Sequence, residues 1–148
     1  MDKVYRKTPV MGWASWNRFR TDISEERMKR QADALVSSGL ADCGYTYLNM
    51  DDGFFGGRSA GGELLFHSER FPNGIKPVAD YAHSLGLKAG IYAEGGDRTC
   101  AYYYDGEGKN GDGAGLYGHE REDLEKLLVE GGFDFIKVDW CGGIRLAL

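Results

Sequence analysis

Short apolar segments with strand character alternate along this chain with amphipathic segments of helical periodicity, and this alternation restricts the fold more than any other feature. Strands are expected at 9–16, 45–50, 88–94 and 133–141. Helices are expected between them, at 24–39, at 75–86 and around 124–128. The order β-α-β-α-β-α-β predicts an α/β fold with about four parallel strands and three helices, joined by right-handed crossovers.

Two architectures have this order, an open doubly wound sheet and a (β/α)8 TIM barrel. A complete barrel needs roughly 200–250 residues, whereas this chain has 148. If the fold is a barrel, the chain supplies the first half, an incomplete barrel whose outer strands lack neighbours. Another chain could cover these exposed barrel edges, so a homo-oligomer is one expectation.

Local signals mark the starts of two helices. Ser24 can cap the first helix, and the two glutamates that follow it suit the positive end of the helix dipole. Pro77 fits the second helix only within its first turn. Glycine-rich segments at 56–62 and 95–118 are expected to be loops.

Composition excludes several classes of protein. The chain has 18 basic and 23 acidic residues, and its net charge of −5 disfavours nucleic-acid binding. No apolar run approaches the ~18–20 residues of a membrane span. The charged start at 1–7 is not followed by the apolar stretch of an export signal. We therefore expect no nucleic-acid partner and no membrane partner.

The cysteine content is low. Three cysteines, at positions 43, 100 and 141, are too few for a disulfide scaffold and lack the spacing of metal ligands. One disulfide with one free thiol is compatible with the sequence, and so are three buried thiols. No metal site is expected from these residues.

Polar residues gather where the expected strands end, which is where α/β folds place their sites. Lys137 and Asp139 stand two apart on a strand, so they point to one face, and burying such a pair without a purpose is costly. A neighbouring lysine keeps a carboxylate ionised, as a glycosidase nucleophile must be. The alternative is a structural ion pair beside a strand-end aspartate.

Adjacent carboxylates, Asp51 and Asp52, end the second expected strand. They can bind sugar hydroxyls, hold a divalent cation or cap the turn that follows, but a cation would need more converging ligands than are evident. Aromatic side chains near strand ends could form a platform for a sugar face or belong to the core: Trp13, Trp16 and Tyr92. No role is assigned to the histidines.

Two motif-like segments are interpreted as coincidental. Residues 113–118 match G-x-G-x-x-G, but the dinucleotide fingerprint requires a strand directly before it, and the preceding strand is expected to end near Glu94. Residues 105–112 resemble a calcium loop, but Lys109 stands where an oxygen ligand is needed. No cofactor is expected.

Four segments, taken in order, resemble glycoside hydrolase family 27, the α-galactosidase and α-N-acetylgalactosaminidase family. The matching letters are TPVMGW with WN at 8–17, YLNMDDG at 47–53, GIYAE with TC at 90–100, and KVDWC at 137–141. The similarity covers nearly the whole chain. It implies a (β/α)8 barrel and retaining hydrolysis of terminal α-galactosides or related α-glycosides, without cofactor or metal.

The resemblance also implies roles for individual residues. Asp139 matches the catalytic nucleophile, and Lys137 matches a lysine beside it that contacts sugar hydroxyls. Asp51 and Asp52 match a pair that binds hydroxyls on the far side of the sugar ring.

Further matched positions concern the pocket walls and a disulfide. Trp13 and Tyr92 match pocket walls. Cys100 and Cys141 match a disulfide, which leaves Cys43 as the odd thiol. A disulfide implies an oxidising compartment, so the resemblance suggests a secreted, periplasmic or lysosomal location.

The chain departs from the family pattern in places. Glu94 stands where the family commonly has Asp, Trp140 where many members have Gly, and 101–115 is a long tyrosine-rich insertion. The family's acid/base carboxylate comes from later strands, beyond Leu148. We therefore expect residues 1–148 to be the N-terminal portion of a single catalytic domain with a carbohydrate substrate, inactive by itself. The alternative is a non-catalytic half-barrel that binds carbohydrate or assembles with another chain.

Overall fold

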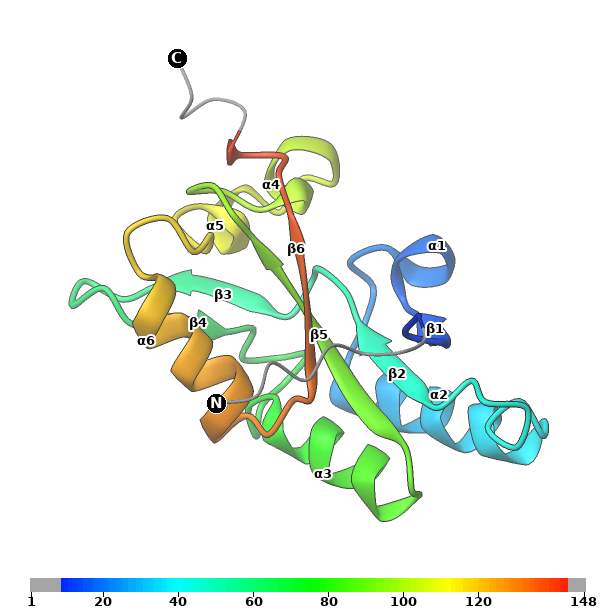
Figure 1. Ribbon diagram of the computed structural model, residues 1–148. Helices are drawn as coiled ribbons and strands as arrows, with labels where there is room; N and C mark the ends of the chain where they lie inside the picture. Colours follow the sequence, from blue (N-terminus) through cyan, green and yellow to red (C-terminus); the bar gives the residue numbers. More distant parts are fainter. Residues whose placement is uncertain (1–8, 144–148) are drawn as a thin grey trace.

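Parallel strands form the central sheet of the computed structural model, which describes residues 9–143. The strands lie in the order β1-β2-β5-β6 (Figure 1), and each neighbouring pair is parallel. Their bounds are Gly12–Ala14 for β1, Tyr47–Met50 for β2, Lys88–Glu94 for β5 and Phe135–Asp139 for β6. The predicted parallel α/β fold is therefore confirmed. Thr8, with which the first family-like segment begins, and the start at 1–7 lie outside the described residues.

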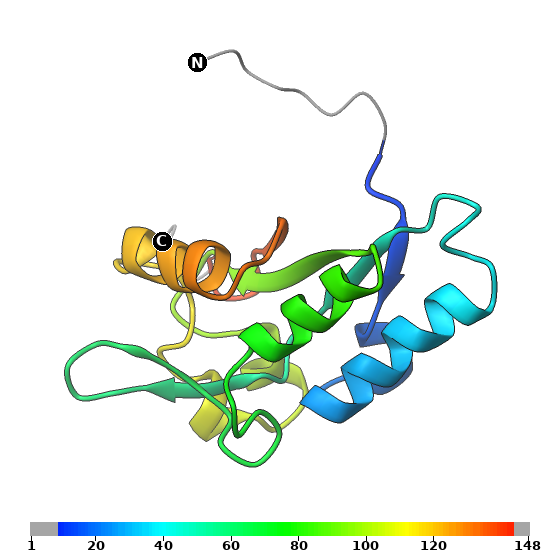
Figure 2. The same cartoon turned by 90° about the horizontal axis from the view of Figure 1, so that it is seen from below.

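Helices cover one face of the sheet. They are α2 (Glu25–Ser37), α3 (Lys76–Ser84) and α6 (Glu120–Leu124), which continues as a π-helical segment, η1 (Glu125–Glu130). Figure 2 shows them in a row against the strands. Ser24 caps α2 as predicted, since its Oγ accepts the N–H of Arg27 at 3.2 Å. Pro77 lies in the first turn of α3, also as predicted.

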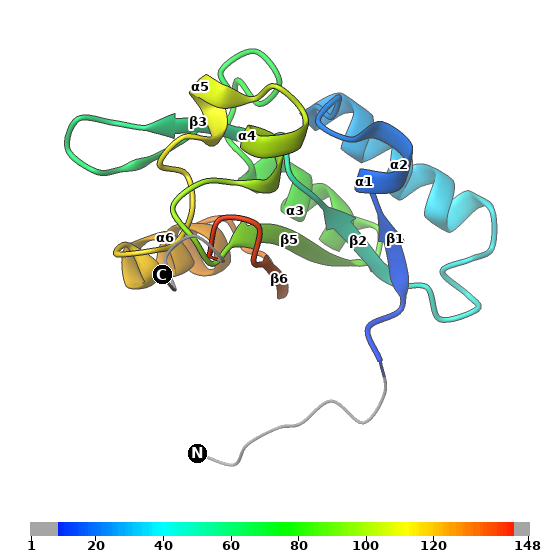
Figure 3. The ribbon, with the colours of Figure 1, turned by 90° about the horizontal axis from the view of Figure 1, so that it is seen from above.

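The glycine-rich segments contain more regular structure than predicted. Part of 56–62 belongs to an antiparallel hairpin of β3 (Phe55–Arg58) and β4 (Leu64–Phe66). The segment 95–118 contains two short helices, α4 (Cys100–Tyr104) and α5 (Gly108–Gly111). These helices lie close to the hairpin (Figure 3). The hairpin forms because its apolar side chains are buried, while Gly62 supplies the positive φ of its turn.

The first strand is shorter than predicted. It ends at Ala14, because the carbonyl of Ser15 accepts the N–H groups of Arg18 and Phe19 and so begins a short helix, α1 (Trp16–Phe19). Trp16 is therefore helical, although the sequence predicted it to be in a strand.

The hydrophobic core lies between the sheet and its helices. Side chains alternate between the two faces of a strand, and those of β2 and β5 that point to the helices are at most 1% exposed: Leu48, Met50, Ala89, Ile91 and Ala93. Burying one large aliphatic side chain contributes about 1.5–3 kcal/mol. This packing fixes the position of each strand along its own axis, and therefore the position of the residues at its end.

The opposite face of the sheet is open. It carries a cavity of about 240 Å³ whose lining includes Asn49, Asp51, Tyr92, Phe135 and Lys137. The sheet does not close, because β1 and β6 are its edges and no strand within residues 9–143 pairs with their outer sides. This agrees with the predicted first half of a barrel. No helix in the same range is long and apolar enough to cross a membrane.

An ion pair between the hairpin and α6 is buried. Two nitrogens of Arg58 donate to the carboxylate of Asp123 at 2.9 and 2.6 Å, and Asp123 is 2% exposed. The same guanidinium donates to the carbonyls of Gly62, Gly113 and Gly115. It thereby anchors the segment that matches G-x-G-x-x-G, which follows a short helix and not a strand. The segment lacks the context of a dinucleotide site, as expected.

Candidate active site

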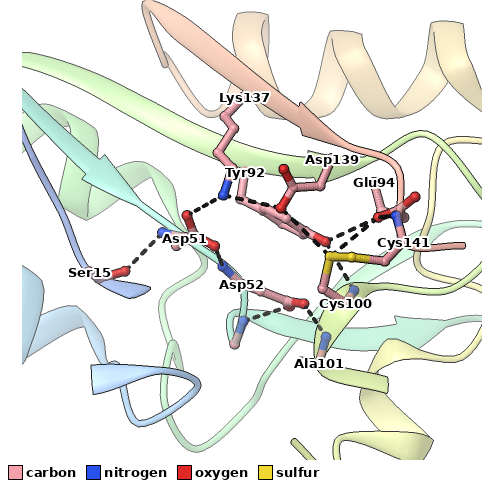
Figure 4. Close-up of polar contacts among 11 residues, drawn as sticks. Ser15, Asp51, Asp52, Tyr92, Glu94, Cys100, Ala101, Lys137, Asp139 and Cys141 are labelled. Atoms are coloured by element: carbon pink, nitrogen blue, oxygen red, sulfur yellow. Dashed lines mark hydrogen bonds and ion pairs between the residues drawn. A yellow bond between two sulfur atoms is a disulfide. The ribbon is translucent and has the colours of Figure 1, made fainter. Parts of the chain in front are cut away.

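Side chains from neighbouring strands meet at the carboxyl-terminal end of the sheet (Figure 4). In the parallel register of β5 and β6, Tyr92 is the partner of Lys137 and Glu94 is the partner of Asp139. In the register of β2 and β5, Met50 is the partner of Ile91. The residue after β2, Asp51, therefore comes level with Tyr92.

Lys137 bridges two carboxylates. Its Nζ lies 2.9 Å from Oδ2 of Asp51 and 3.1 Å from Oδ2 of Asp139. Burial by itself would lower the pKa of Lys137, but hydrogen bonds and charge from Asp51 and Asp139 outweigh burial and raise it. The side chain of Asp51 is 6% exposed and that of Asp139 is 35% exposed. Asp139 is therefore the more accessible of the two carboxylates.

Asp51 is held from its backbone side as well. Its N–H donates to Oγ of Ser15 at 2.9 Å, and the N–H of Ser15 donates to the carbonyl of Asn49 at 3.1 Å. These bonds tie the end of β1 to the end of β2. The direction of the Asp51 carboxylate toward Lys137 is thus supported by a second strand.

Asp52 lies in a different environment from its neighbour. It is 2% exposed, and its two oxygens accept the N–H groups of Gly53 at 2.7 Å and Ala101 at 2.8 Å. Burial raises the pKa of Asp52 to about 6, although hydrogen bonds from Ala101 and from the side chain of Thr99 oppose the rise. The bond to Ala101 also holds the start of α4 against the end of β2.

Tyr92 forms an aromatic wall next to Lys137. The residue is buried, and Nζ of Lys137 lies 5.4 Å from the centre of its ring. Its hydroxyl accepts the N–H of Cys100 at 3.1 Å. Burial, assisted by the charge of Asp52, raises the pKa of Tyr92, so its hydroxyl stays neutral. The ring is therefore a fixed, uncharged surface of the cavity.

A disulfide closes one side of the site. Cys100 and Cys141 are bonded, with their Cα atoms 5.3 Å apart, as the family resemblance implied. Sγ of Cys100 lies 3.6 Å from Oδ2 of Asp139. Cys43 is free and exposed. The alternative of three buried thiols is therefore wrong.

Glu94 and the two bonded cysteines place three possible ligand atoms within 4.8 Å of one another. Sulfur in a disulfide is not a thiolate, and the thiolate is the form that binds metals. The cluster is therefore not a metal centre while the disulfide is intact. Glu94 has other partners, described below.

The structure does not bring the tryptophans together with these residues. Trp13 packs edge-on against Phe19, with ring centroids 5.9 Å apart, and contacts the hydrophobic core. Neither it nor Trp16 is among the described residues that line the cavity. Trp16 instead stacks under the guanidinium of Arg20, whose Cζ lies 4.5 Å from the ring centre.

Two hydroxyl residues of the site, Ser15 and Thr99, had no predicted role. Ser15 directly follows β1, and Thr99 caps α4 in the loop after β5. Because parallel strands end at one edge of a sheet, hydroxyl residues just beyond those ends were a usable signal.

Sequence comparison identifies the protein family of this chain. A sequence model of the alpha galactosidase A family matches residues 8–143. The chain belongs to this family, glycoside hydrolase family 27. This match confirms the resemblance to family 27 that the four sequence segments indicated.

Two curated relatives show how much of a family 27 enzyme the chain covers. Alpha-galactosidase A of Cellvibrio japonicus is 42% identical over 135 residues, which are 91% of this chain and 31% of the relative. The alpha-galactosidase of Coffea arabica is 43% identical over 141 residues, which are 95% of this chain and 35% of the relative. The chain spans about a third of the length of these relatives.

Solved structures of family 27 agree with the half-barrel. The α-galactosidase of Saccharomyces cerevisiae superimposes with a TM-score of 0.79 at 36% identity, covering 90% of this chain and 27% of that one. A β-L-arabinopyranosidase of Geobacillus stearothermophilus gives a TM-score of 0.69 at 26% identity, covering 90% and 40%. Family 27 enzymes named for different sugars thus share this part of the barrel, so the fold alone does not specify the sugar.

Proposed function

We propose that this chain supplies the nucleophile and part of the sugar-binding surface of a retaining family 27 glycosidase. One observation carries the proposal: Lys137 connects the accessible carboxylate of Asp139 to the buried carboxylate of Asp51 at the active end of the sheet. A glycosidase nucleophile must be ionised and fixed in position. A charged lysine within hydrogen-bonding distance meets both requirements.

The proposed reaction has two steps. An oxygen of Asp139 attacks the anomeric carbon while the glycosidic C–O bond breaks, and the leaving oxygen takes a proton from a second carboxyl group. Water then cleaves the glycosyl ester, gives a proton to that second group and restores the Asp139 carboxylate. Retaining enzymes hold the two carboxyl groups about 5–5.5 Å apart.

The second carboxyl group is not assigned within residues 9–143. Asp51 is paired with Lys137, and both oxygens of Asp52 accept backbone N–H groups, as do those of Glu94. We therefore propose that the chain by itself has negligible turnover. The remainder of a family 27 barrel would supply the acid/base.

Four side chains are proposed to bind the sugar next to Asp139. Asp51 and Lys137 offer an acceptor and a donor for hydroxyl groups, and Tyr92 offers a neutral aromatic wall. Each carboxylate oxygen has two lone pairs, so Asp52 can also accept a sugar hydroxyl beside its backbone bonds. The relatives named alpha-galactosidase, and a Saccharomyces cerevisiae enzyme solved with raffinose, support a terminal galactoside as substrate.

A chimera tests this function. The chain replaces the corresponding N-terminal third of the Coffea arabica α-galactosidase, and hydrolysis of an aryl α-galactoside is measured. We expect turnover by the chimera and a loss on the order of 10⁴-fold in Asp139→Asn, because a catalytic group is removed. Asp134→Asn, at the other end of β6, is the control and should retain turnover. A folded chimera whose Asp139→Asn variant is as active as its parent would refute the assignment.

A second candidate function rests on the open sheet. The edges of β1 and β6 are unpaired within the described residues, so a non-catalytic half-barrel could pair with another copy of the chain while binding carbohydrate. Sedimentation of the isolated chain helps to distinguish the two candidate functions. A stable dimer that binds galactose, together with an inactive chimera, would favour the non-catalytic half-barrel. In either case the disulfide supports an oxidising compartment such as the cell exterior, periplasm or lysosome.

A further inference from the structure

Glu94 is the most completely buried charged residue near the site, and the proposed reaction does not use it. It is 0% exposed. A carboxylate in such a position is strongly unfavourable unless its oxygens are hydrogen-bonded. The partners of these oxygens therefore indicate what the residue does.

Three backbone N–H groups donate to Glu94. Oε1 accepts from Gly96 at 3.0 Å and from Gly142 at 3.1 Å, and Oε2 accepts from Cys141 at 3.0 Å. The hydroxyl of Tyr92 lies 3.5 Å from Oε2. One carboxylate thus binds the segment leaving β5 and the segment leaving β6 at the same time.

The two segments approach each other too closely for most side chains. A Cβ atom added to Gly96 would collide with the backbone of Gly142 and Gly143, and one added to Gly142 would collide with the carbonyl of Arg98. Only such a close crossing lets donors from both segments reach one carboxylate. The crossing begins directly after Asp139, whose carbonyl accepts the N–H of Gly95 at 2.9 Å.

We propose that Glu94 is a positioning residue that fixes the end of β6, and with it the Asp139 carboxylate, in parallel with the Cys100–Cys141 disulfide. This inference deepens the proposed function, since it assigns a task in keeping the nucleophile directed at the cavity. Cys141 is held twice, covalently through its sulfur and by Glu94 through its N–H. Reduction of the disulfide therefore leaves the second attachment in place.

A carboxylate is needed at this position because both side-chain oxygens of Glu94 accept hydrogen bonds. Glutamine at this position would keep one acceptor oxygen but would direct an NH₂ group at a backbone N–H, so at least one bond would become a clash between donors. Aspartate is one methylene shorter and could not reach the donors of both segments without movement of the backbone.

The test uses the chain as it is, with NMR spectroscopy as the readout. In Glu94→Gln, amide hydrogen exchange at Cys141 and Gly142 should accelerate about tenfold or more, the equivalent of losing one charge-assisted hydrogen bond. The carboxyl ¹³C signal of Asp139 should change as well. Asp134→Asn removes a carboxylate that accepts the N–H of Ala89 at the other end of β6, and should change neither.

Reduction of the disulfide is the second arm, in which wild type is compared with a milder substitution at Glu94. If Glu94 holds the end of β6, amide exchange at Gly142 should stay slow after reduction in wild type and should accelerate in reduced Glu94→Asp. The proposal is refuted if reduction of wild type alone accelerates exchange at Gly142 as much as it does in the variant. It is also refuted if Glu94→Gln leaves the exchange of Cys141 and Gly142 unchanged. Hydrolysis is not measured, so an inactive chimera would refute the proposed function without affecting this result.

Discussion

The Nζ atom of Lys137 lies 2.9 Å from Oδ2 of Asp51, although 86 residues separate the two in the sequence. The contact joins the end of β2 to β6 across β5, which lies between them in the sheet. The two side chains meet only when all three strands keep their parallel register. The ion pair is therefore a sensitive reporter of whether the active end of the sheet is assembled.

Replacement of Lys137 by methionine should weaken sugar binding. The variant keeps an unbranched apolar side chain but removes the donor between Asp51 and Asp139, so the Kd of galactose for the chimera should rise about tenfold or more. Calorimetric titration measures it. Lys126→Met removes a lysine paired with Glu63 away from the site and should leave the Kd unchanged. Equal affinity in both variants would exclude a sugar contact by Lys137.

Removal of the disulfide should destabilise the chain. The bond closes a loop with a sequence separation of 41 residues, and loss of a cross-link of this span lowers the free energy of unfolding by about 2–4 kcal/mol. Denaturant titration of the Cys100→Ser, Cys141→Ser double variant measures the change. Cys43→Ser, which removes the exposed free thiol, should unfold like wild type. A double variant as stable as wild type would contradict the prediction.

The Arg58–Asp123 pair should contribute strongly to stability. In Arg58→Met the Asp123 carboxylate remains buried without its partner, and breaking a buried pair in this way costs about 3–5 kcal/mol. Arg30→Met breaks an exposed pair with Glu26 on α2, for which about 0–1 kcal/mol is expected. Urea unfolding of the two variants compares the costs directly. Similar losses of unfolding free energy in both variants would show that burial does not determine how much an ion pair contributes to stability.

Asp52 should make stability depend on pH in the weakly acidic range. Burial raises its pKa from 3.8 to about 6, so the folded state binds the proton more tightly than the unfolded state. Its contribution to stability is then complete below pH 3.8 and is lost as the pH rises to about 6, an effect of up to about 3 kcal/mol. Asp52→Asn should remove this slope, measured by urea unfolding at several pH values.

Asp134 provides the control with the opposite sign. Hydrogen bonds from Ala89, His83 and Lys88 outweigh its burial and lower the pKa of Asp134 to about 2. Its contribution is present above pH 3.8 and is lost as the pH falls toward 2. Asp134→Asn should therefore leave the slope between pH 4 and 6 as it is in wild type. If Asp52→Asn also retained that slope, another group would be responsible.

The sequence predicted the parts of the fold that depend on local chemistry. Ser24 has a side chain suited to capping and Pro77 tolerates only the first turn of a helix, so both positions were readable from the residues alone. The glycines at 56–62 indicated a loop, but burial of Phe55 and Leu64 draws this segment into a hairpin. Tertiary burial of this kind has no fixed spacing in a sequence.

The sequence predicted those parts of the candidate site that are formed by side chains. Alternation on a strand placed Lys137 and Asp139 on one face, and the strand-end rule placed Asp51 next to them. The bonds of Glu94 could not be predicted in this way, because every residue except proline has a backbone N–H. Which donors reach a buried carboxylate depends on the path of two loops, and the sequence does not state that path.

Cys43 lies in the turn that leads into the amino-terminal end of β2, whereas the carboxylates lie beyond its opposite end. A maleimide-linked fluorophore or a surface tether attached to this thiol would leave the sugar-facing end unobstructed. The chain thus carries its own handle for immobilisation and for single-molecule measurements of ligand binding.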